Sequence, residues 1–583
     1  MILIPVSIDK DLSLKKEAVL LGQWCKNKYT SEVPKENILS YHWEDRTKFN
    51  KDYTYIQALY ETLLPEYVKA LNIHHNSSFS EMFWRISFGN WLQSFITVAF
   101  DRWTMAHLAS ASFKIDEVAI INTENNSLIP KNMRDYSNFC SKSDEWNSYI
   151  FYKIFEGFTN IKIKNLQIKT SKKSKLEYSV IKKLALKAKR MMLYLMSKLL
   201  NYYSQKNKIV FVDSYLPLLE QWKIEIKLKQ FPSYFKFDEY LPSNFSKEYR
   251  RSLSISYAPK NDFESFLISL IPEQVPISYL ENFNKILSNF SKFPLSSSVK
   301  VIFTANAHLF NDQFNIWSAH AKENGAKLII GQHGGGTRSL KVDQSLDHEY
   351  AICDYYVAWG KGGHVNKKNI ILPVNKFSDN FTKIKIKKSG LLHVLDTNYR
   401  YIKNMYSNEL TSSFIHYFNS QILFSSLIQN KSNKDYKLRP NKNSINAGWS
   451  KDFDFVARNE TDNQKHFLKS IKKNRLILIS VNQTTFLQSL AMNIPTVGFW
   501  DMKKVLLEEN SFNDYKKLFE VGILFDSPQK AANHINDHWE NIEKWWNSTE
   551  LQKARIEFCD KYIYTSNNSE RIKQWGSFFS KFL

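Results

Sequence analysis

Residues 332–336, with the sequence Gln-His-Gly-Gly-Gly, form the segment best suited to chemistry. They follow an apolar run at 327–331 that predicts a buried strand, and ligands of open α/β sheets bind at the carboxyl ends of strands. Consecutive glycines let backbone N–H groups approach a phosphate or a sugar without a Cβ in the way. The chain holds only 16 glycines in 583 residues, so three in a row are conspicuous. We expect His333 to be a general base or a phosphate ligand. Gly334, Gly335, Gly336 and Arg338 are expected to bind the phosphate or sugar of a substrate that donates a group. The alternative is that this segment is only a tight turn.

A second candidate site lies within 475–500, which has the pattern of strand, polar turn, helix, loop and strand. The turn stands at the start of the predicted helix, where free N–H groups and the helix dipole favour an anion. Thr484 and Thr485 are expected to cap this helix. The predicted donor-binding side chains of this unit are Ser480, Asn482, Gln483, Thr484 and Thr485. The alternative is a plain strand–helix–strand unit with a good N-cap.

Four residues at predicted strand ends are further candidates. Arg439 ends a short apolar and basic strand, and its planar guanidinium can clamp a phosphate. Asp213 follows the strand at 208–213 and is a candidate base or nucleophile, or a helix cap. Asn306 and His308 follow the strand at 299–304, so we expect them to face the crevice of His333 on the acceptor side.

The N-terminal region combines charge with large aromatic side chains, at 41–46 (Tyr-His-Trp-Glu-Asp-Arg) and 100–103 (Phe-Asp-Arg-Trp). In one interpretation the two segments pair their charges inside a core, Glu44 or Asp45 with Arg102, or Asp101 with Arg46. In the other they form an acceptor pocket, in which His42, Trp43 and Arg46 bind a sugar and Glu44 or Asp45 is the base.

Short β-branched runs predict the strands that position these groups. They lie at 2–7, 117–122, 208–213, 299–304, 327–331, 354–358, 390–395, 436–439, 475–481, 495–499 and 522–525. The runs are continuous rather than alternating, and helical segments separate many of them, which predicts parallel strands buried on both faces. We expect an α/β fold with two Rossmann-like, doubly wound domains. The first spans 1–365 on the acceptor side, with a helical insertion at about 14–110, the second is the donor-binding domain at 389–530, and helices follow at 531–583.

A basic amphipathic helix is predicted at 171–203, with lysines on one side and leucine, methionine and alanine on the other. It suits an anionic membrane surface, or else it packs on its own domain. No apolar stretch reaches the ~18 residues of a membrane span, and no basic segment precedes the apolar N-terminus as in a signal peptide. We expect a cytoplasmic protein that is at most peripheral on the inner face of the membrane.

The composition is that of a large, basic, folded protein. There are 80 Lys+Arg and 57 Asp+Glu, a net charge of +23, and 43% of the residues are hydrophobic, which excludes a disordered chain. The charge suits nucleic acid, an anionic membrane or phosphorylated substrates. The sequence lacks DNA-binding signatures, a Walker loop and paired zinc cysteines, so we expect neither a nucleic-acid partner nor a metal. Nothing in the sequence favours one oligomeric state.

The predicted two-sheet layout resembles the GT-B glycosyltransferase architecture, in which two doubly wound domains face each other across a cleft. The segment 480–498 is similar to the donor-binding strand–helix–strand of that class, and 332–334 resembles the His-Gly turn of bacterial capsule, lipopolysaccharide and teichoic-acid transferases. Most of the chain resembles an uncharacterised transferase family of bacterial surface-polysaccharide loci, through residues 22–25, 41–46, 84–86, 100–103 and 332–336.

This resemblance implies a nucleotide-sugar donor, for example a CMP-linked acidic sugar such as Kdo or a nonulosonic acid, and a surface glycan or lipid-linked acceptor. It implies no cofactor and no metal. The runner-up is a CDP-linked polyol-phosphate transferase, and a different class is a basic, non-catalytic protein that binds membrane or nucleic acid. The chain departs from the wider class at Asn493, where glycine is common. It also departs after Arg439, where Pro440 and Asn441 stand in place of the His-Pro pair that often follows the arginine strand. We expect Asn493 to take the left-handed conformation that ends its helix.

Overall fold

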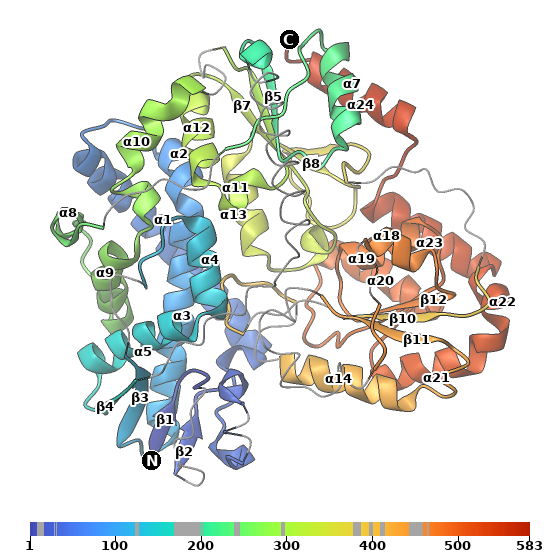
Figure 1. The fold of residues 1–583 in the computed structure, drawn as a ribbon, viewed down its shortest axis with the longest axis horizontal. Coiled ribbons are helices and arrows are strands. Elements are labelled where there is room, and N and C mark those ends of the chain that lie inside the picture. The colour runs from blue at the N-terminus through green and yellow to red at the C-terminus, as the bar shows by residue number, and fades with distance from the viewer. Residues whose placement is uncertain are drawn as a thin grey trace, which may run out of the picture.

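The computed structural model describes residues 1–8, 17–27, 29–30, 32–122, 128–167, 200, 202–237, 245–292, 298–376, 386–395, 400–408, 414–441, 459–462, 464 and 466–583. The strands of this part of the chain form three parallel sheets with helices around them (Figure 1). The predicted helix at 171–203 lies outside the described residues, except for its positions 200, 202 and 203.

The three sheets have a defined order of strands. The N-terminal sheet has the order β2-β1-β3-β4, with β1 Ile2–Ile4, β2 Ala18–Leu20, β3 Glu117–Ile121 and β4 Lys162–Leu166. The central sheet has the order β5-β6-β7-β8-β9, with β5 Ile209–Val212, β6 Val301–Thr304, β7 Lys327–Gly331, β8 Tyr355–Ala358 and β9 Asn369–Ile371. The C-terminal sheet has the order β11-β10-β12-β13-β14, with β10 Leu391–Val394, β11 Tyr436–Arg439, β12 Leu476–Ile479, β13 Thr496–Phe499 and β14 Leu524–Phe525.

The parallel strands expected from the apolar runs are therefore confirmed, but their grouping differs from the expected two-sheet layout. The first group of strands divides between the N-terminal and central sheets. Strand β2 lies inside the region 14–110 that we expected to be helical, and α-helix there begins only with α1 (Arg46–His75). A strand of three residues is too short to show a periodicity of its own, so its neighbourhood dominated the pattern.

The strand orders also differ from the expected pair of doubly wound sheets. The chain order reverses direction at β1 in the N-terminal sheet and at β10 in the C-terminal sheet, as in doubly wound folds. In the central sheet the strands follow the chain order without reversal. Two helices distant in sequence, α7 (Leu218–Lys227) and α24 (Asn568–Ser580), together cover one face of the central sheet.

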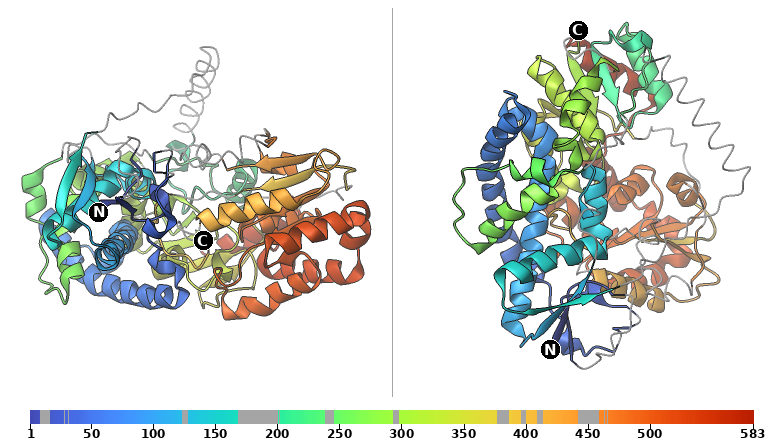
Figure 2. Two further views of the ribbon diagram at one scale, coloured as in Figure 1. Left: turned by 90° about the horizontal axis from the view of Figure 1, so that it is seen from below. Right: turned by 60° about the vertical axis from the view of Figure 1, so that its left-hand side comes forward.

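Helices connect the strands and surround the sheets (Figure 2). The others in the N-terminal and central parts are α2 Glu81–Trp84, α3 Asn90–Ser112, α4 Met133–Lys142, α5 Asp144–Phe158, α8 Lys247–Arg251, α9 Asp262–Gln274, α10 Phe283–Ser288, α11 Ala307–Phe310, α12 Asp312–Glu323 and α13 Gln344–Ile352. Those around the C-terminal sheet are α14 Phe414–Leu427, α18 Phe467–Ile471, α19 Thr484–Ala491, α20 Glu509–Glu520, α21 Pro528–His538, α22 Ile542–Trp546 and α23 Thr549–Tyr562. Many begin at a polar cap: Asp45, for example, accepts from the N–H groups of Thr47 and Lys48 at the start of α1.

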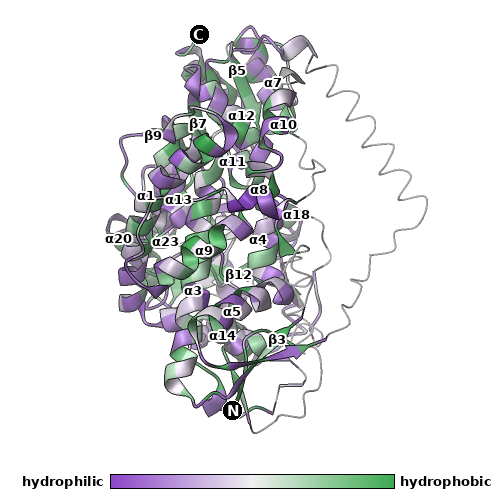
Figure 3. Cartoon of the chain, turned by 90° about the vertical axis from the view of Figure 1, so that its left-hand side faces the viewer, coloured by the Kyte–Doolittle hydropathy of each residue, from purple (hydrophilic) through white to green (hydrophobic). Residues whose placement is uncertain are grey.

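The apolar core joins the units of the fold. Val118 of β3 and Ile330 of β7 belong to one cluster of buried side chains, so the N-terminal and central sheets share a core. Figure 3 shows the apolar colour of β5 and β7 between the helices. Leu340 and Trp359, which lie in the chain near β7 and β8, pack into the core of the C-terminal sheet. Among the described helices, none is long and apolar enough to cross a membrane.

Candidate functional site

His333 lies just beyond the end of β7, and its imidazole lies against a buried carboxylate. The Nδ1 atom of His333 is 3.4 Å from Oε1 of Glu349, and Nε2 of His308 is 2.9 Å from the same oxygen. Glu349, on α13, and His308, on α11, are fully buried, whereas 30% of the His333 side chain is exposed. His308 therefore lies near His333, as expected, and Glu349 joins the two rings, but the ring of His308 is buried and does not face a crevice. Its role in acceptor binding stays a prediction.

His308, Glu349 and His333 form a group that we call the His333 cluster, and Glu349 is its acidic member. Burial raises the pKa of the carboxyl, but the hydrogen bonds and charges of His308 and His333 outweigh burial and lower the pKa of Glu349 to about 2. Glu349 is thus ionised at neutral pH. A buried carboxylate behind a partly exposed imidazole fixes the orientation of the ring, which is the arrangement of a general base.

The glycine turn after His333 touches the start of α19. The N–H of Gly335 donates to Oγ1 of Thr484 over 2.9 Å. Gly336 has a φ of +85°, and a Cβ at this position would lie 2.2 Å from the backbone oxygen of Asn482. Only glycine permits this approach, so the structure gives the glycines a packing role between the central and C-terminal sheets in addition to any contact with a ligand.

Two side chains hold the glycine turn and the loop beside it. The amide of Gln332 donates to the backbone oxygen of Gly334 (2.7 Å), and its carbonyl accepts from the N–H of Trp359 (3.0 Å). The buried guanidinium of Arg338 donates to the backbone oxygens of Gly360 (2.6 Å) and His364 (2.8 Å). In this structure Arg338 therefore orders the loop after β8.

The predicted donor residues at the start of α19 occupy different environments. Asn482 is buried, where its amide donates to Oγ of Ser339 (3.0 Å) and its carbonyl accepts from Tyr515 (2.8 Å). The expected capping by Thr484 and Thr485 is wrong: Gln483 stands at the N-cap, without a side-chain cap bond, and both threonines are in the first helical turn. The helix starts one residue earlier than the threonine pattern suggested, and the hydroxyl of Thr484 accepts from the glycine turn instead of capping the helix.

Arg439 is held inside its own unit. It ends the edge strand β11, pairs with Asp462, donates to Oγ of Ser470 (2.8 Å) and lies 5.8 Å from the ring centre of Phe467. The structure does not bring it to the glycine turn, and its phosphate-binding role stays a prediction.

The loops after β5, β6 and β9 meet near His333. Nζ of Lys376, in the loop after β9, donates to the backbone oxygen of His333 (3.2 Å) and lies 4.6 Å from the ring centre of Tyr215. Asp213 is exposed and has a φ of +45°. Asn306, half-buried, precedes α11. The positive φ of Asp213 is a strained conformation for a residue other than glycine, and such strain is enriched at functional sites.

The charges at 41–46 and 100–103 are paired, but not as expected. Asp101 pairs with its neighbour Arg102 and accepts from Tyr41 (2.6 Å), and its Oδ1 lies 3.0 Å from Nε2 of His42. The indole of Trp43 donates to Asp52 (2.8 Å). The predicted pairs of Glu44 or Asp45 with Arg102, and of Asp101 with Arg46, are therefore wrong.

The partners that Asp45 and Arg102 take instead explain the difference. The side chain of Asp45 caps the start of α1. The guanidinium of Arg102 donates to the buried backbone oxygens of Cys140 and Ile402, so it needs only one carboxylate. Arg46 instead stacks 4.1 Å from the ring centre of Phe49, and burial lowers the pKa of Arg46 to about 10.

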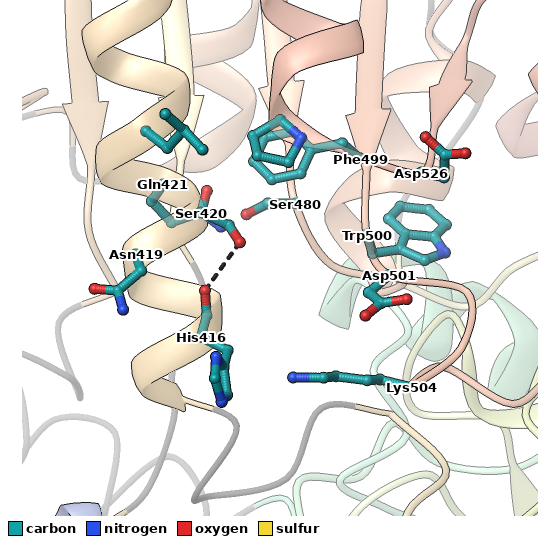
Figure 4. Close-up of a pocket in the computed structure, with 12 residues that line it drawn as sticks. His416, Asn419, Ser420, Gln421, Ser480, Phe499, Trp500, Asp501, Lys504 and Asp526 are labelled. Atoms are coloured by element: carbon teal, nitrogen blue, oxygen red, sulfur yellow. Dashed lines mark hydrogen bonds between the residues drawn. The ribbon is translucent and has the colours of Figure 1, made fainter. Parts of the chain in front are cut away.

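A cavity of about 290 Å³ opens at the carboxyl edge of the C-terminal sheet (Figure 4). Ser480 follows β12, Trp500 and Asp501 follow β13, and Asp526 follows β14, while α14 closes the other side. The lining residues are His416, Asn419, Ser420, Gln421, Leu423, Ser480, Phe499, Trp500, Asp501, Lys504, Asp526 and Pro528. Ligands of doubly wound sheets bind outside these strand ends, near the reversal of strand order at β10 and β12.

Charged and unpaired polar groups line this cavity. Figure 4 shows His416 and Lys504 on opposite sides of its opening. The buried indole N–H of Trp500 has no hydrogen-bond partner within the described structure. Nε2 of His416 lies 3.7 Å from Oε1 of Glu44, so the predicted acceptor segment borders the rim of the cavity.

A family model described as LIC12162 family transferase matches residues 1–579. The chain belongs to the LIC12162 family of transferases. The match includes all three sheets, the His333 cluster and the cavity. No curated protein and no solved structure matches the chain.

Three parts of this LIC12162 family transferase escaped the sequence analysis: Glu349, Lys376 and the cavity residues around Lys504. Glu349 belongs to an ordinary polar helix pattern, and only the packing of α13 brings it to His333. Among the residues that the structure describes, no three His, Cys, Asp or Glu side chains are grouped to hold a metal ion. The expectation that the transferase needs no metal stays a prediction.

Proposed function

We propose that this transferase is a glycosyltransferase, in which the C-terminal sheet has the role of the donor-binding domain of GT-B enzymes, and that it moves a sugar from a nucleotide donor to a surface glycan or lipid-linked acceptor. The observation that carries the proposal is the cavity at the carboxyl edge of the C-terminal sheet, beside the reversal of its strand order. Its volume of about 290 Å³ is near the lower end of small-molecule sites, ~300–1,000 Å³. It therefore suits one nucleotide rather than a dinucleotide.

The cavity offers a group for each part of a nucleotide. Lys504 supplies a cation for a phosphate, and Ser480 supplies a hydroxyl group to the same cavity. Asp501 and Asp526 can accept from the hydroxyl groups of a ribose. The indole ring of Trp500 lines the cavity and offers an apolar face to the base. These groups fit a CMP-linked acidic sugar, and they fit other nucleotide sugars equally well.

The His333 cluster supplies the chemistry of transfer. His333 takes the proton from the acceptor hydroxyl, the hydroxyl oxygen forms a bond to the anomeric carbon, and the bond from that carbon to the donor phosphate breaks with its electron pair. Glu349 holds the imidazole in its orientation, and Lys376 offsets negative charge near the leaving phosphate.

The turn at 480–485 connects the two parts of the proposed site. Ser480 lines the cavity, and Thr484 accepts the hydrogen bond from Gly335 beside His333. Glu44 borders the same cavity from the N-terminal side through His416. We place the acceptor on this side, with Glu44 as the second candidate base.

Donor binding is tested first with the full-length protein and a panel of CMP, UDP, GDP and CDP. One nucleotide is expected to raise the melting temperature, and Lys504→Ala to weaken its binding at least about tenfold, as expected for the loss of one charged hydrogen bond. Lys503→Ala, at an exposed neighbour, is the matched control and keeps wild-type affinity. If no nucleotide raises the melting temperature, or if the two lysine variants behave alike, the donor site is wrong.

The product decides between the remaining alternatives. With the nucleotide donor identified, a glycosidic product whose formation is lost in His333→Gln, with nucleotide affinity unchanged, supports the proposal. A phosphodiester product identifies a polyol-phosphate transferase instead. Salt-sensitive binding of polynucleotide without any nucleotide binding identifies the non-catalytic protein.

A further inference from the structure

An apolar surface covers the outer side of α7 and the chain segments next to it. Five large hydrophobic side chains there are each 54% to 72% exposed: Tyr202, Tyr203, Leu219, Ile226 and Phe231. Leu219 and Ile226 lie seven residues apart, two helical turns, so they project from the same side of α7. We call these five residues the α7 patch.

Hydrogen bonds hold the patch together across the sequence. The amide of Asn207 donates to the backbone oxygen of Phe231 (2.8 Å), and the carbonyl of Gln230 accepts from the N–H of Ile209 (2.9 Å). These bonds fasten the turn after α7 to residues 207–209, at the start of β5. The rings of Tyr203 and Phe231 stack with centres 5.4 Å apart, and the Tyr202 ring lies edge-on to Tyr203 at 5.4 Å.

The patch is also part of a rigid support. Arg571 of α24 pairs with the buried Glu220 on the inner side of α7, its Nε donating to Oε2 over 2.8 Å. Trp575 and Phe579 of α24 pack with Phe303 of β6 in the same core. The outer side of α7 therefore presents its apolar groups from a fixed position.

The charge of the chain segments that form the patch is mainly positive. Six lysines of this region are exposed: Lys206, Lys208, Lys223, Lys227, Lys229 and Lys236. The two glutamates of α7 are turned inward, Glu220 toward Arg571 and Glu225 toward Ser233. Among the described residues 202–237, Asp213 is the one exposed carboxylate. Positive charge thus surrounds exposed apolar groups.

We propose that the α7 patch docks on an anionic lipid bilayer. Tyrosine rings are favoured at the boundary between lipid headgroups and acyl chains, because one end is apolar and the other is polar. Lysines beside the apolar groups attract anionic headgroups near the membrane surface. Apolar insertion and basic charge together provide the two signals that stable attachment requires. The inference rests on this surface alone and holds whichever group the transferase moves.

The test is co-sedimentation of the full-length protein with vesicles of neutral phosphatidylcholine, or of the same lipid with anionic phosphatidylglycerol. The wild-type protein is expected to bind the anionic vesicles, and less as salt is raised. Lys206→Glu with Lys208→Glu and Lys223→Glu is expected to weaken this binding at least about tenfold. The matched control reverses three exposed lysines elsewhere, Lys51, Lys367 and Lys516, and keeps it.

Apolar variants and a label test the insertion itself. Tyr203→Ser with Leu219→Ser and Phe231→Ser is expected to lose binding, while Ile73→Ser with Val365→Ser and Phe512→Ser, at other exposed positions, keeps it. An environment-sensitive dye on Leu219→Cys is expected to shift to the blue with anionic vesicles, and the same dye on Phe512→Cys to stay unchanged.

Three results would overturn the proposal. They are absence of wild-type binding to anionic vesicles, equal binding by the patch variants and the wild type, and a dye at position 219 that does not respond. If the patch variants lose binding to poly(U) but retain vesicle binding, the surface serves single-stranded nucleic acid, whose bases stack on such rings.

Discussion

The contact between the glycine turn and α19 can be tested by adding one methyl group at a time. A Cβ on Gly336 would lie 2.2 Å from the backbone oxygen of Asn482, at a φ of +85°. A Cβ on Gly334 would lie 3.2 Å from the hydroxyl oxygen of Thr484, which can move. Gly157, in α5, has nothing within 4 Å of the added carbon and is the control.

These distances set the expected magnitudes. Overpacking against a backbone atom costs about 1–3 kcal/mol, and the left-handed conformation costs a residue with a Cβ about 1–2 kcal/mol more. Gly336→Ala is therefore expected to lower the free energy of unfolding by about 2–5 kcal/mol. Gly334→Ala should lower it by less than about 1 kcal/mol, and Gly157→Ala should raise it by roughly 0.5–1 kcal/mol.

Urea unfolding, followed by tryptophan fluorescence, measures the three changes. Amide hydrogen exchange adds the location: Gly336→Ala is expected to increase exchange on both sides of the contact, at 334–340 and at 482–490. If Gly336→Ala unfolds at the wild-type urea concentration with unchanged exchange, the glycine turn does not pack on α19 in solution. The glycines would then act on a ligand alone.

Three further changes have defined outcomes. Glu349→Gln removes the carboxylate that orients the imidazole of His333, so turnover should fall while nucleotide affinity stays unchanged; turnover equal to the wild type would contradict the pairing. Asn493→Ala should lower the free energy of unfolding, measured in urea, by about 1–2 kcal/mol, because φ is +54° and the Asn493 side chain accepts from Trp546 (2.9 Å). Asn493→Gly, which keeps the conformation, should lower it less. Burial lowers the pKa of four histidines to about 3 or 4, below the value of about 6.5 in the unfolded chain. The unfolded state therefore binds more protons between these values, so the free energy of unfolding falls as the pH drops from about 6.5 to 4. The fall is up to about 1.4 kcal/mol per pH unit for each histidine. These histidines are His75, His348, His393 and His534. Glu225, whose pKa burial raises to about 7, acts in the opposite sense, and a melting temperature that is equal at pH 7 and pH 5 would refute the net effect.

The sequence by itself determined the local elements. Strands such as β7 and β12 follow their apolar runs because a strand buried on both faces needs continuous apolar residues. Asn493 takes the left-handed conformation because few other residues end a helix in this way. The prominence of the glycines at 334–336 also came from the sequence, and so did the place of His333 at a strand end.

Only the tertiary structure decided what these elements meet. Glu349 reaches His333, and Asn482 reaches Gly336, across separations in sequence that no local period records. The same holds for the third sheet, for the pairing of Arg102 with Asp101 and for the place of α24 on the central sheet. Local patterns fix which face of an element is apolar, but the partner of a buried charge or of a glycine is chosen by the packing of whole elements, which satisfies all of their contacts at once.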